Sequence, residues 1–115
     1  MFSKDKSPNL RRATDGLLNQ ARQLIGKGDY QLAETICEKA LNSWRTGSVP
    51  RSEEGRIVLL LGKCYEAQRK YEKAYDLYME SLKHLTGSTY DDVYSSLLYL
   101  NERMGAFEKK DATDY

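Results

Sequence analysis

Apolar residues recur in the first part of the chain at the three- and four-residue spacing of one helix face. The first such run comprises Leu17, Leu18, Ala21, Leu24 and Ile25. Two helix starts fit: Ser7 before Pro8, with the proline in a first turn that needs no N–H, or Thr14 with Asp15. The run ends at Gly26-Lys27-Gly28-Asp29, because glycine tolerates the left-handed conformation that closes a helix.

The same spacing resumes directly after this turn. The second run comprises Tyr30, Ala33, Ile36, Cys37, Ala40, Leu41 and Trp44. Because the connection is so short, the second helix must run back antiparallel to the first. Residues 46–51 hold turn formers and predict a loop, and Ser52 before Glu53-Glu54 is typical of a helix cap.

A second hairpin follows the loop. Its first helix has an apolar band wide enough to be covered on more than one side, formed by Ile57, Val58, Leu59, Leu60, Leu61, Cys64 and Tyr65. After the turn at residues 67–70, the return helix carries Tyr71, Ala74, Tyr75, Tyr78, Ser81, Leu82 and Leu85.

The remaining residues predict a third, shorter hairpin. The pattern breaks at residues 86–89, where Thr89 resembles a weak capping box with Asp92. A fifth helix is indicated by Val93, Tyr94, Leu97, Leu98 and Leu100. A break at residues 104–106 then predicts a short return helix from Phe107 to Tyr115. The expected organisation is residues 1–13 as an extension or early part of the first helix, then hairpins of about 14–45, 53–86 and 90–115.

Aligning the hairpins on their turns reveals an internal repeat in which an aromatic residue opens each second helix. The aligned segments are Gly28-Asp29-Tyr30-Gln31-Leu32-Ala33, Arg69-Lys70-Tyr71-Glu72-Lys73-Ala74 and Gly105-Ala106-Phe107-Glu108-Lys109-Lys110. This pattern resembles the tetratricopeptide repeat. The middle unit matches it at Leu61-Gly62, Tyr65, Ala74, Tyr78 and Ser81. The third unit is degenerate, because Leu98 and Lys110 stand where small residues are expected.

The resemblance implies an all-α, right-handed α-solenoid of antiparallel helical hairpins, with five to six helices; an ordinary helical bundle is the alternative. Gly62 and Ala74 are expected where two helix backbones approach closely. The family binds a peptide or helix of a partner in a groove formed by the first helices. Carried over position by position, the groove residues are Leu18, Asn19, Arg22, Ile25, Arg56, Leu59, Lys63, Glu66, Ser95, Ser96, Tyr99 and Arg103.

This groove would be mixed in character with a modest basic bias. Its cations could hold an acidic side chain or terminal carboxylate, and its apolar residues could take apolar anchors. The family members that bind chaperone tails use a Lys–Asn/Asn/Lys–Arg clamp, whereas the corresponding places here are Leu18, Arg22, Leu60, Asp92 and Ser96. The clamp is absent, so acidic chaperone tails are not the expected ligand.

Charge and composition narrow the classes of partner. Eighteen Lys and Arg against seventeen Asp and Glu leave a net charge of +1. This charge is too small to produce the strong positive potential that attracts nucleic acid. No apolar run has the length of a transmembrane helix, and the polar start lacks the apolar stretch of a secretory signal. We therefore expect a cytoplasmic protein with no membrane insertion and a protein or peptide partner.

The chemistry-bearing residues favour no catalysis, metal or cofactor. Cys37 and Cys64 lie within apolar helical patterns and are expected to be reduced core thiols. His84, the single histidine, lies near a helix end where a dipole contact is the simpler role. Phosphate loops, zinc spacings and dinucleotide fingerprints are missing from the sequence.

Two functions remain. The first is an adaptor that binds a partner in the groove. The second is a structural assembly subunit that self-associates or docks into a complex through its C-terminal helices, because a short last helix leaves Val93, Leu97 and Leu100 undercovered.

Overall fold

The computed structural model describes residues 6–45 and 51–112, and side chains within 15–43 and 54–105. These residues form five helices and no strand. The helices are α1 (Lys6–Gly26), α2 (Tyr30–Arg45), α3 (Arg51–Ala67), α4 (Tyr71–Leu82) and α5 (Gly87–Ala112).

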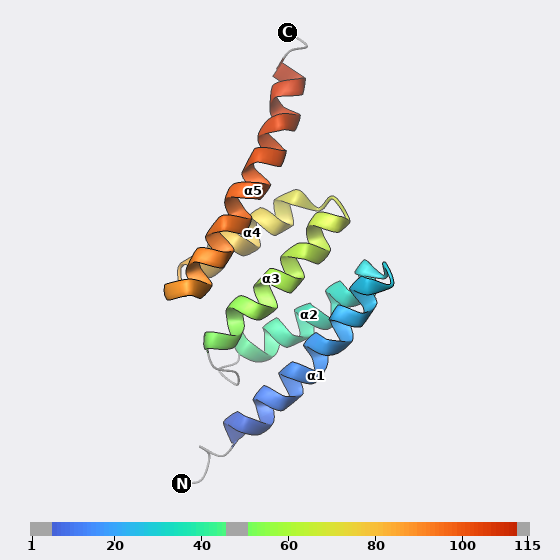
Figure 1. The fold of residues 1–115 in the computed structure, drawn as a ribbon, viewed down its shortest axis with the longest axis vertical. Coiled ribbons are helices and arrows are strands. Elements are labelled where there is room, and N and C mark those ends of the chain that lie inside the picture. Colours follow the sequence, from blue (N-terminus) through green and yellow to red (C-terminus); the bar gives the residue numbers. More distant parts are fainter. Residues whose placement is uncertain (1–5, 46–50, 113–115) are drawn as a thin grey trace.

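The helices stack as two layers (Figure 1). Each helix packs on its neighbour in sequence, and α1, α3 and α5 also pack on one another in that order, α1 on α3 and α3 on α5. These three helices form the layer that faces the viewer in Figure 1, and α2 and α4 lie behind them. The predicted all-α solenoid of antiparallel helical hairpins is confirmed.

The two hairpin turns share one geometry. After α1, Asp29 N–H donates to the Leu24 carbonyl (2.8 Å) and Gly28 N–H to the Ile25 carbonyl (3.0 Å). After α3, the same pattern joins Lys70 N–H to Tyr65 O (2.8 Å) and Arg69 N–H to Glu66 O (3.0 Å). This is the Schellman closure, which needs a left-handed residue. Gly28 (φ 82°) and Arg69 (φ 62°) supply it.

The structure decides between the two predicted starts of the first helix and corrects the start of the fifth. The first helix begins at Lys6, so the start near Pro8 is right and the one at Thr14 is wrong. The fifth helix begins at Gly87, which places Thr89 inside it and not at its cap. The side chains of Trp44 and Ser52 lie outside the described residues.

The predicted third hairpin is also wrong. The fifth helix runs without a break from Gly87 to Ala112, through the expected turn at residues 104–106. It therefore extends past the other helices (Figure 1). At Gly105, within this continuous helix, no other group lies within 4 Å of the position that a Cβ would take. A glycine permits a left-handed turn but does not impose one.

Close packing holds the second hairpin together, as the repeat pattern predicted. Ala74 is fully buried, and a methyl group added at Gly62 would overlap the ring and hydroxyl of Tyr78 on the facing helix. A second close approach was not anticipated. A methyl at Gly55 would overlap the side chain of Thr89 at the start of α5.

A single apolar core runs through all five helices. Its largest fully buried side chains are Tyr78, Leu18, Ile57, Leu61, Leu100, Val58, Val93, Cys37 and Cys64. Leu18 is 0% exposed, so its predicted role in a partner groove is wrong. Of the two adjacent leucines, Leu17 is the half-buried one.

A polar contact ties the first hairpin to the second. The buried carboxylate of Glu34 on α2 accepts hydrogen bonds from Gln68 Nε2 (2.7 Å) and Lys70 Nζ (2.9 Å) at the turn after α3. Burial alone would raise its pKa, but the bonds from Lys70 and Gln68 outweigh that effect. The pKa of Glu34 therefore lies below its usual value.

A depressed pKa in the folded state makes stability depend on pH. The contribution of Glu34 should be present above the carboxyl's unfolded pKa and be lost as the pH falls through the folded value. We expect Glu34→Gln to lower the free energy of unfolding by about 1 kcal/mol at neutral pH and to flatten its decline in acid. Denaturant unfolding across a pH series measures both. Glu72→Gln, on the exposed side of α4, serves as the control, and an equal change in both variants would contradict the assignment.

Candidate functional site

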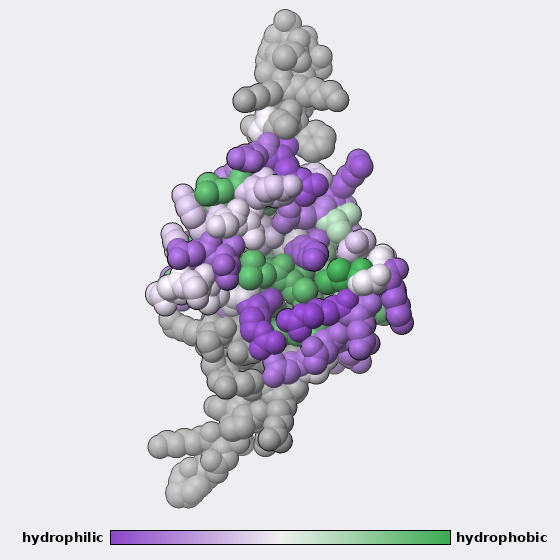
Figure 2. Space-filling view, in the orientation of Figure 1, coloured by the Kyte–Doolittle hydropathy of each residue, from purple (hydrophilic) through white to green (hydrophobic). Residues whose placement is uncertain are grey.

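A hollow of about 370 Å³ lies between α3 and α5 on the layer formed by α1, α3 and α5. It is lined by Leu59, Lys63, Glu66, Ala67, Tyr78, Ser96 and Arg103. Figure 2 views this layer and shows apolar surface at its centre, bordered by strongly polar side chains. Apolar surface ringed by polar groups is the usual composition of a protein-binding surface.

The floor of the hollow is polar and fixed. Tyr78 reaches it from α4, and its hydroxyl donates to Glu66 Oε2 at 2.7 Å. Gly62 leaves the space in which the Tyr78 ring lies. Burial and the hydrogen bond to the Glu66 carboxylate raise the pKa of Tyr78, so the phenol stays protonated and remains a donor.

The second oxygen of Glu66 is also held. Arg103 on α5 donates to Glu66 Oε1 at 3.3 Å. Its guanidinium lies 5.6 Å from the ring centre of Tyr71 and 5.8 Å from that of Tyr99. Cation–π contacts with two rings restrict the arginine. Helices α3, α4 and α5 thus each contribute to one network, which fixes the shape of this part of the surface.

The structure brings together five of the twelve residues predicted for the groove. Leu59, Lys63, Glu66, Ser96 and Arg103 line the hollow. Arg103 forms an ion pair with Glu66, whereas the sequence analysis expected the arginine to hold a ligand. Its distance from Glu66 along the chain, 37 residues, explains why the sequence did not reveal the pair.

The other predicted residues lie around the hollow or outside it. Tyr99 is 62% exposed and contacts Arg103, and Ser95 is exposed on α5. On α1, Arg22 donates to Asn19 at 3.1 Å, and Ile25 is half-buried against the core.

Arg56 forms an ion pair with Asp15 (2.9 Å) that joins α3 to α1. Both side chains are 42% exposed, so the pair adds little stability but shares the charge of Arg56.

Three residues of the site were not predicted for it. The sequence pattern places Ala67 in a turn and Tyr71 and Tyr78 on a return helix, whereas the groove was expected on the first helices. The close approach at Gly62 is the signal that could have identified Tyr78. A glycine in the middle of a helix leaves room for a large side chain that can reach through.

A larger hollow, about 600 Å³, lies on the opposite layer between α2 and α4. Its lining residues are Glu38, Leu41, Asn42, Leu61, Tyr65, Lys73, Asp76, Leu77 and Glu80. Tyr65 donates to Glu38 (2.8 Å), and the Lys73 ammonium lies 5.8 Å from the Tyr65 ring centre. We take the smaller hollow as the candidate site because it lies on the layer formed by the first helices, where the family resemblance places the groove.

Potential metal ligands and the two cysteines are the groups in the described residues to consider for chemistry. Within them, no group of three or more His, Cys, Asp or Glu side chains is placed to hold a metal ion. Cys37 and Cys64 are free and buried, and the hydrogen bond to Cys64 and burial raise the pKa of the Cys37 thiol. A protonated, enclosed thiol is a poor nucleophile. Nor does any helix in the described segments have the length and hydropathy to cross a bilayer.

Comparison with known proteins agrees with the hairpin repeat. No curated protein matches the chain significantly. The sequence model described as tetratricopeptide repeat matches residues 13–87, which hold most of α1, all of α2, α3 and α4, and the first residue of α5. Because this match covers more than half of the 115 residues, the chain belongs to the tetratricopeptide repeat family.

Proposed function

We propose that this chain is an adaptor that binds a peptide or helix of a partner protein over the hollow between α3 and α5. Tetratricopeptide repeats generally mediate protein–protein interaction. The observation that carries the proposal is the fixed polar floor of Tyr78, Glu66 and Arg103 beneath an open surface. A preorganised surface binds without the entropic cost of ordering its own side chains.

The charges favour a ligand with a carboxylate near Lys63. The positive charges of Arg103 and Arg56 are shared with Glu66 and Asp15. Lys63 is exposed and lines the hollow beside the apolar Leu59. An acidic side chain followed by an apolar one is the simplest match to this pair.

A peptide selection tests the proposal. Peptides selected on the immobilised chain from a random library should bind Lys63→Glu at least about tenfold more weakly, because an attraction becomes a repulsion. Arg56→Glu should also weaken binding, by less, because its charge is shared with Asp15. Lys39→Glu, at an exposed position of α2 in the opposite layer, is the matched control. Far-UV circular dichroism confirms that each variant remains folded. Equal affinity of the selected peptides for Lys63→Glu and the parent chain would refute the assignment.

A further inference from the structure

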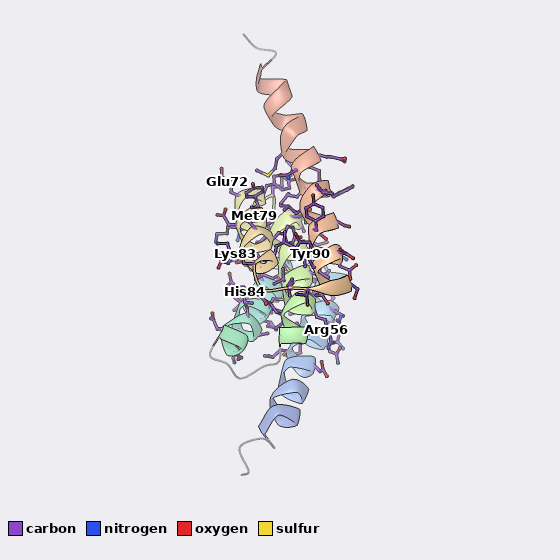
Figure 3. The ribbon with its side chains drawn as sticks, turned by 90° about the vertical axis from the view of Figure 1, so that its left-hand side faces the viewer. Arg56, Glu72, Met79, Lys83, His84 and Tyr90 are labelled. Atoms are coloured by element: carbon purple, nitrogen blue, oxygen red, sulfur yellow. The ribbon has the colours of Figure 1, made fainter. Side chains whose placement is uncertain are left out.

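One flank of α5 is apolar and uncovered. Tyr90, Tyr94 and Leu98 follow each other at four-residue intervals and are 36%, 44% and 47% exposed. The rings of Tyr90 and Tyr94 are stacked with centroids 6.0 Å apart. Met79 on α4 is 42% exposed, and Figure 3 labels both Met79 and Tyr90 in a side view of the molecule. We call these four side chains the α5 face.

The positions that correspond to Leu98 are buried in both other first helices, and the α3 position that corresponds to Tyr94 is buried, whereas its α1 counterpart, Leu17, is half-buried. Aligned on the turns, Leu98 corresponds to Gly62 of α3 and Ala21 of α1, and Tyr94 corresponds to Val58. Gly62, Ala21 and Val58 are buried, and Gly62 lies directly under Tyr78 of the return helix. Because α5 continues straight through residues 104–106, no return helix covers its equivalent flank.

Leu98 also determines what can pack here. At the spacing of the α3–α4 pair, even a methyl group at the corresponding Gly62 would overlap Tyr78. A leucine at that position is therefore too large for a return helix at the spacing of the α3–α4 pair. The α5 face suits a helix whose axis lies further from α5 than the axis of α4 lies from α3. Such a helix would contact the face with large side chains, since the distance between helix axes increases with side-chain size.

We propose that the α5 face binds the α5 face of a second copy of this chain, with the two helices antiparallel about a two-fold axis at Tyr94. The series Tyr90, Tyr94, Leu98 is self-complementary in that arrangement. Tyr94 of one copy meets Tyr94 of the other, and each Leu98 packs on the opposite Tyr90. An isologous interface requires such matching of a surface with itself.

The charges at the two ends of the face agree with antiparallel pairing. Glu102 continues the four-residue series beyond Leu98, and Lys83 precedes the face at the end of α4. Pairing about Tyr94 brings Glu102 of one copy level with residue 86 of the other, three residues along the chain from Lys83. In the single chain Lys83 is 68% exposed and contacts Glu80 at 3.1 Å. A surface pair of this kind is weak, so Lys83 can be shared with Glu102 across the interface.

Sedimentation equilibrium of the purified chain over a concentration series tests the proposal. The parent chain should dimerise, and Leu98→Glu should raise its dissociation constant by about a hundredfold, because the symmetric interface loses the leucine twice. Leu32→Glu is the matched control. Leu32 is 48% exposed, and it lies on α2, which does not contact α5. A parent chain that stays monomeric throughout, or an equal effect of the two variants, would overturn the proposal. If a partner protein or a later segment of the same protein covers this face instead, the purified chain should stay monomeric.

Cross-linking tests the two-fold axis. Under diamide, which accepts the two electrons and two protons released by a pair of thiols, Tyr94→Cys should form a disulfide-linked dimer on non-reducing gels. Leu98→Cys should cross-link at least about tenfold more slowly, because it faces Tyr90 and not itself. The parent chain is the background control, since its two cysteines are buried. Higher oligomers, or faster cross-linking at Leu98→Cys, would contradict antiparallel pairing at Tyr94.

Discussion

Replacing Gly62 by alanine should lower the free energy of unfolding by about 2–3 kcal/mol, although alanine is the better helix former. The added methyl group would overlap both the ring and the hydroxyl of Tyr78, which is 1% exposed and has no room to withdraw. Either α3 and α4 separate or the ring rotates away from Glu66. Both outcomes cost more than the gain of about 1 kcal/mol in helix propensity.

The identical substitution at Gly16 is the control. Gly16 lies in α1 and is exposed, and no other side chain lies within 4 Å of the position that its Cβ would take. Gly16→Ala should therefore stabilise the chain by about 0.5–1 kcal/mol, through helix propensity alone. Chemical denaturation of the two variants measures both changes. Opposite signs would show that packing against Tyr78, and not the glycine's flexibility, requires Gly62. A neutral or stabilising Gly62→Ala would contradict the close packing.

Much of the fold could be predicted because its signals are local. Helices α1 to α4 follow from apolar spacing, and the turns at Gly28 and Arg69 follow from the repeat that surrounds them. Family resemblance then gave the order in which the hairpins stack. Each step needs information from at most a few turns of chain.

The course of α5 could not be predicted, because the deciding signal is not local. The segment from Gly105 to Lys110 matches the turns of the other hairpins in sequence, yet the helix continues through it. A chain reverses when the returning helix gains enough burial to offset the loss of helical hydrogen bonds. Leu98 stands where Gly62 and Ala21 admit a return helix, so that gain is reduced here.

The sequence could predict which residues gather at the hollow better than the contacts that they make there. Family positions located Leu59, Lys63, Glu66, Ser96 and Arg103 on one surface. They misplaced Leu18, because Leu17 and Leu18 are equivalent by composition and differ in the direction that each faces. The ion pair of Arg103 with Glu66 spans helices far apart in sequence. Such pairing depends on interhelical distances, which helix periodicity does not give.

These contacts link the surface of the proposed groove to the core. Among the described residues, Tyr78 has the largest fully buried side chain, and it also forms part of the floor of the hollow. Glu66 receives one hydrogen bond from this core residue and one from Arg103 on α5. A change in the packing of α4 against α3 should therefore disturb the hydrogen bond that Tyr78 donates to Glu66. Binding and stability should respond together to substitution at Tyr78.

Replacing Tyr78 by alanine should produce the largest loss among the substitutions considered, about 3–5 kcal/mol, because it empties a cavity the size of an aromatic ring. Tyr78→Phe separates the ring from the hydroxyl. It keeps the packing but leaves Glu66 Oε2 without its donor, at a cost of about 1–2 kcal/mol. Thermal and urea unfolding of the two variants measure the difference. If Tyr78→Phe were as destabilising as Tyr78→Ala, the hydroxyl and not the ring would be the main contribution.

Alkaline pH gives an independent measure of the same hydroxyl. Burial and the bond to Glu66 raise the pKa of Tyr78 in the folded chain, so its contribution to stability is complete below the unfolded pKa of about 10. Stability should fall as the pH rises above that value, since the unfolded tyrosine ionises first. Tyr78→Phe should remove this part of the decline. If the decline persisted in Tyr78→Phe, the phenol would not be held protonated by Glu66, and the polar floor of the groove would need another description.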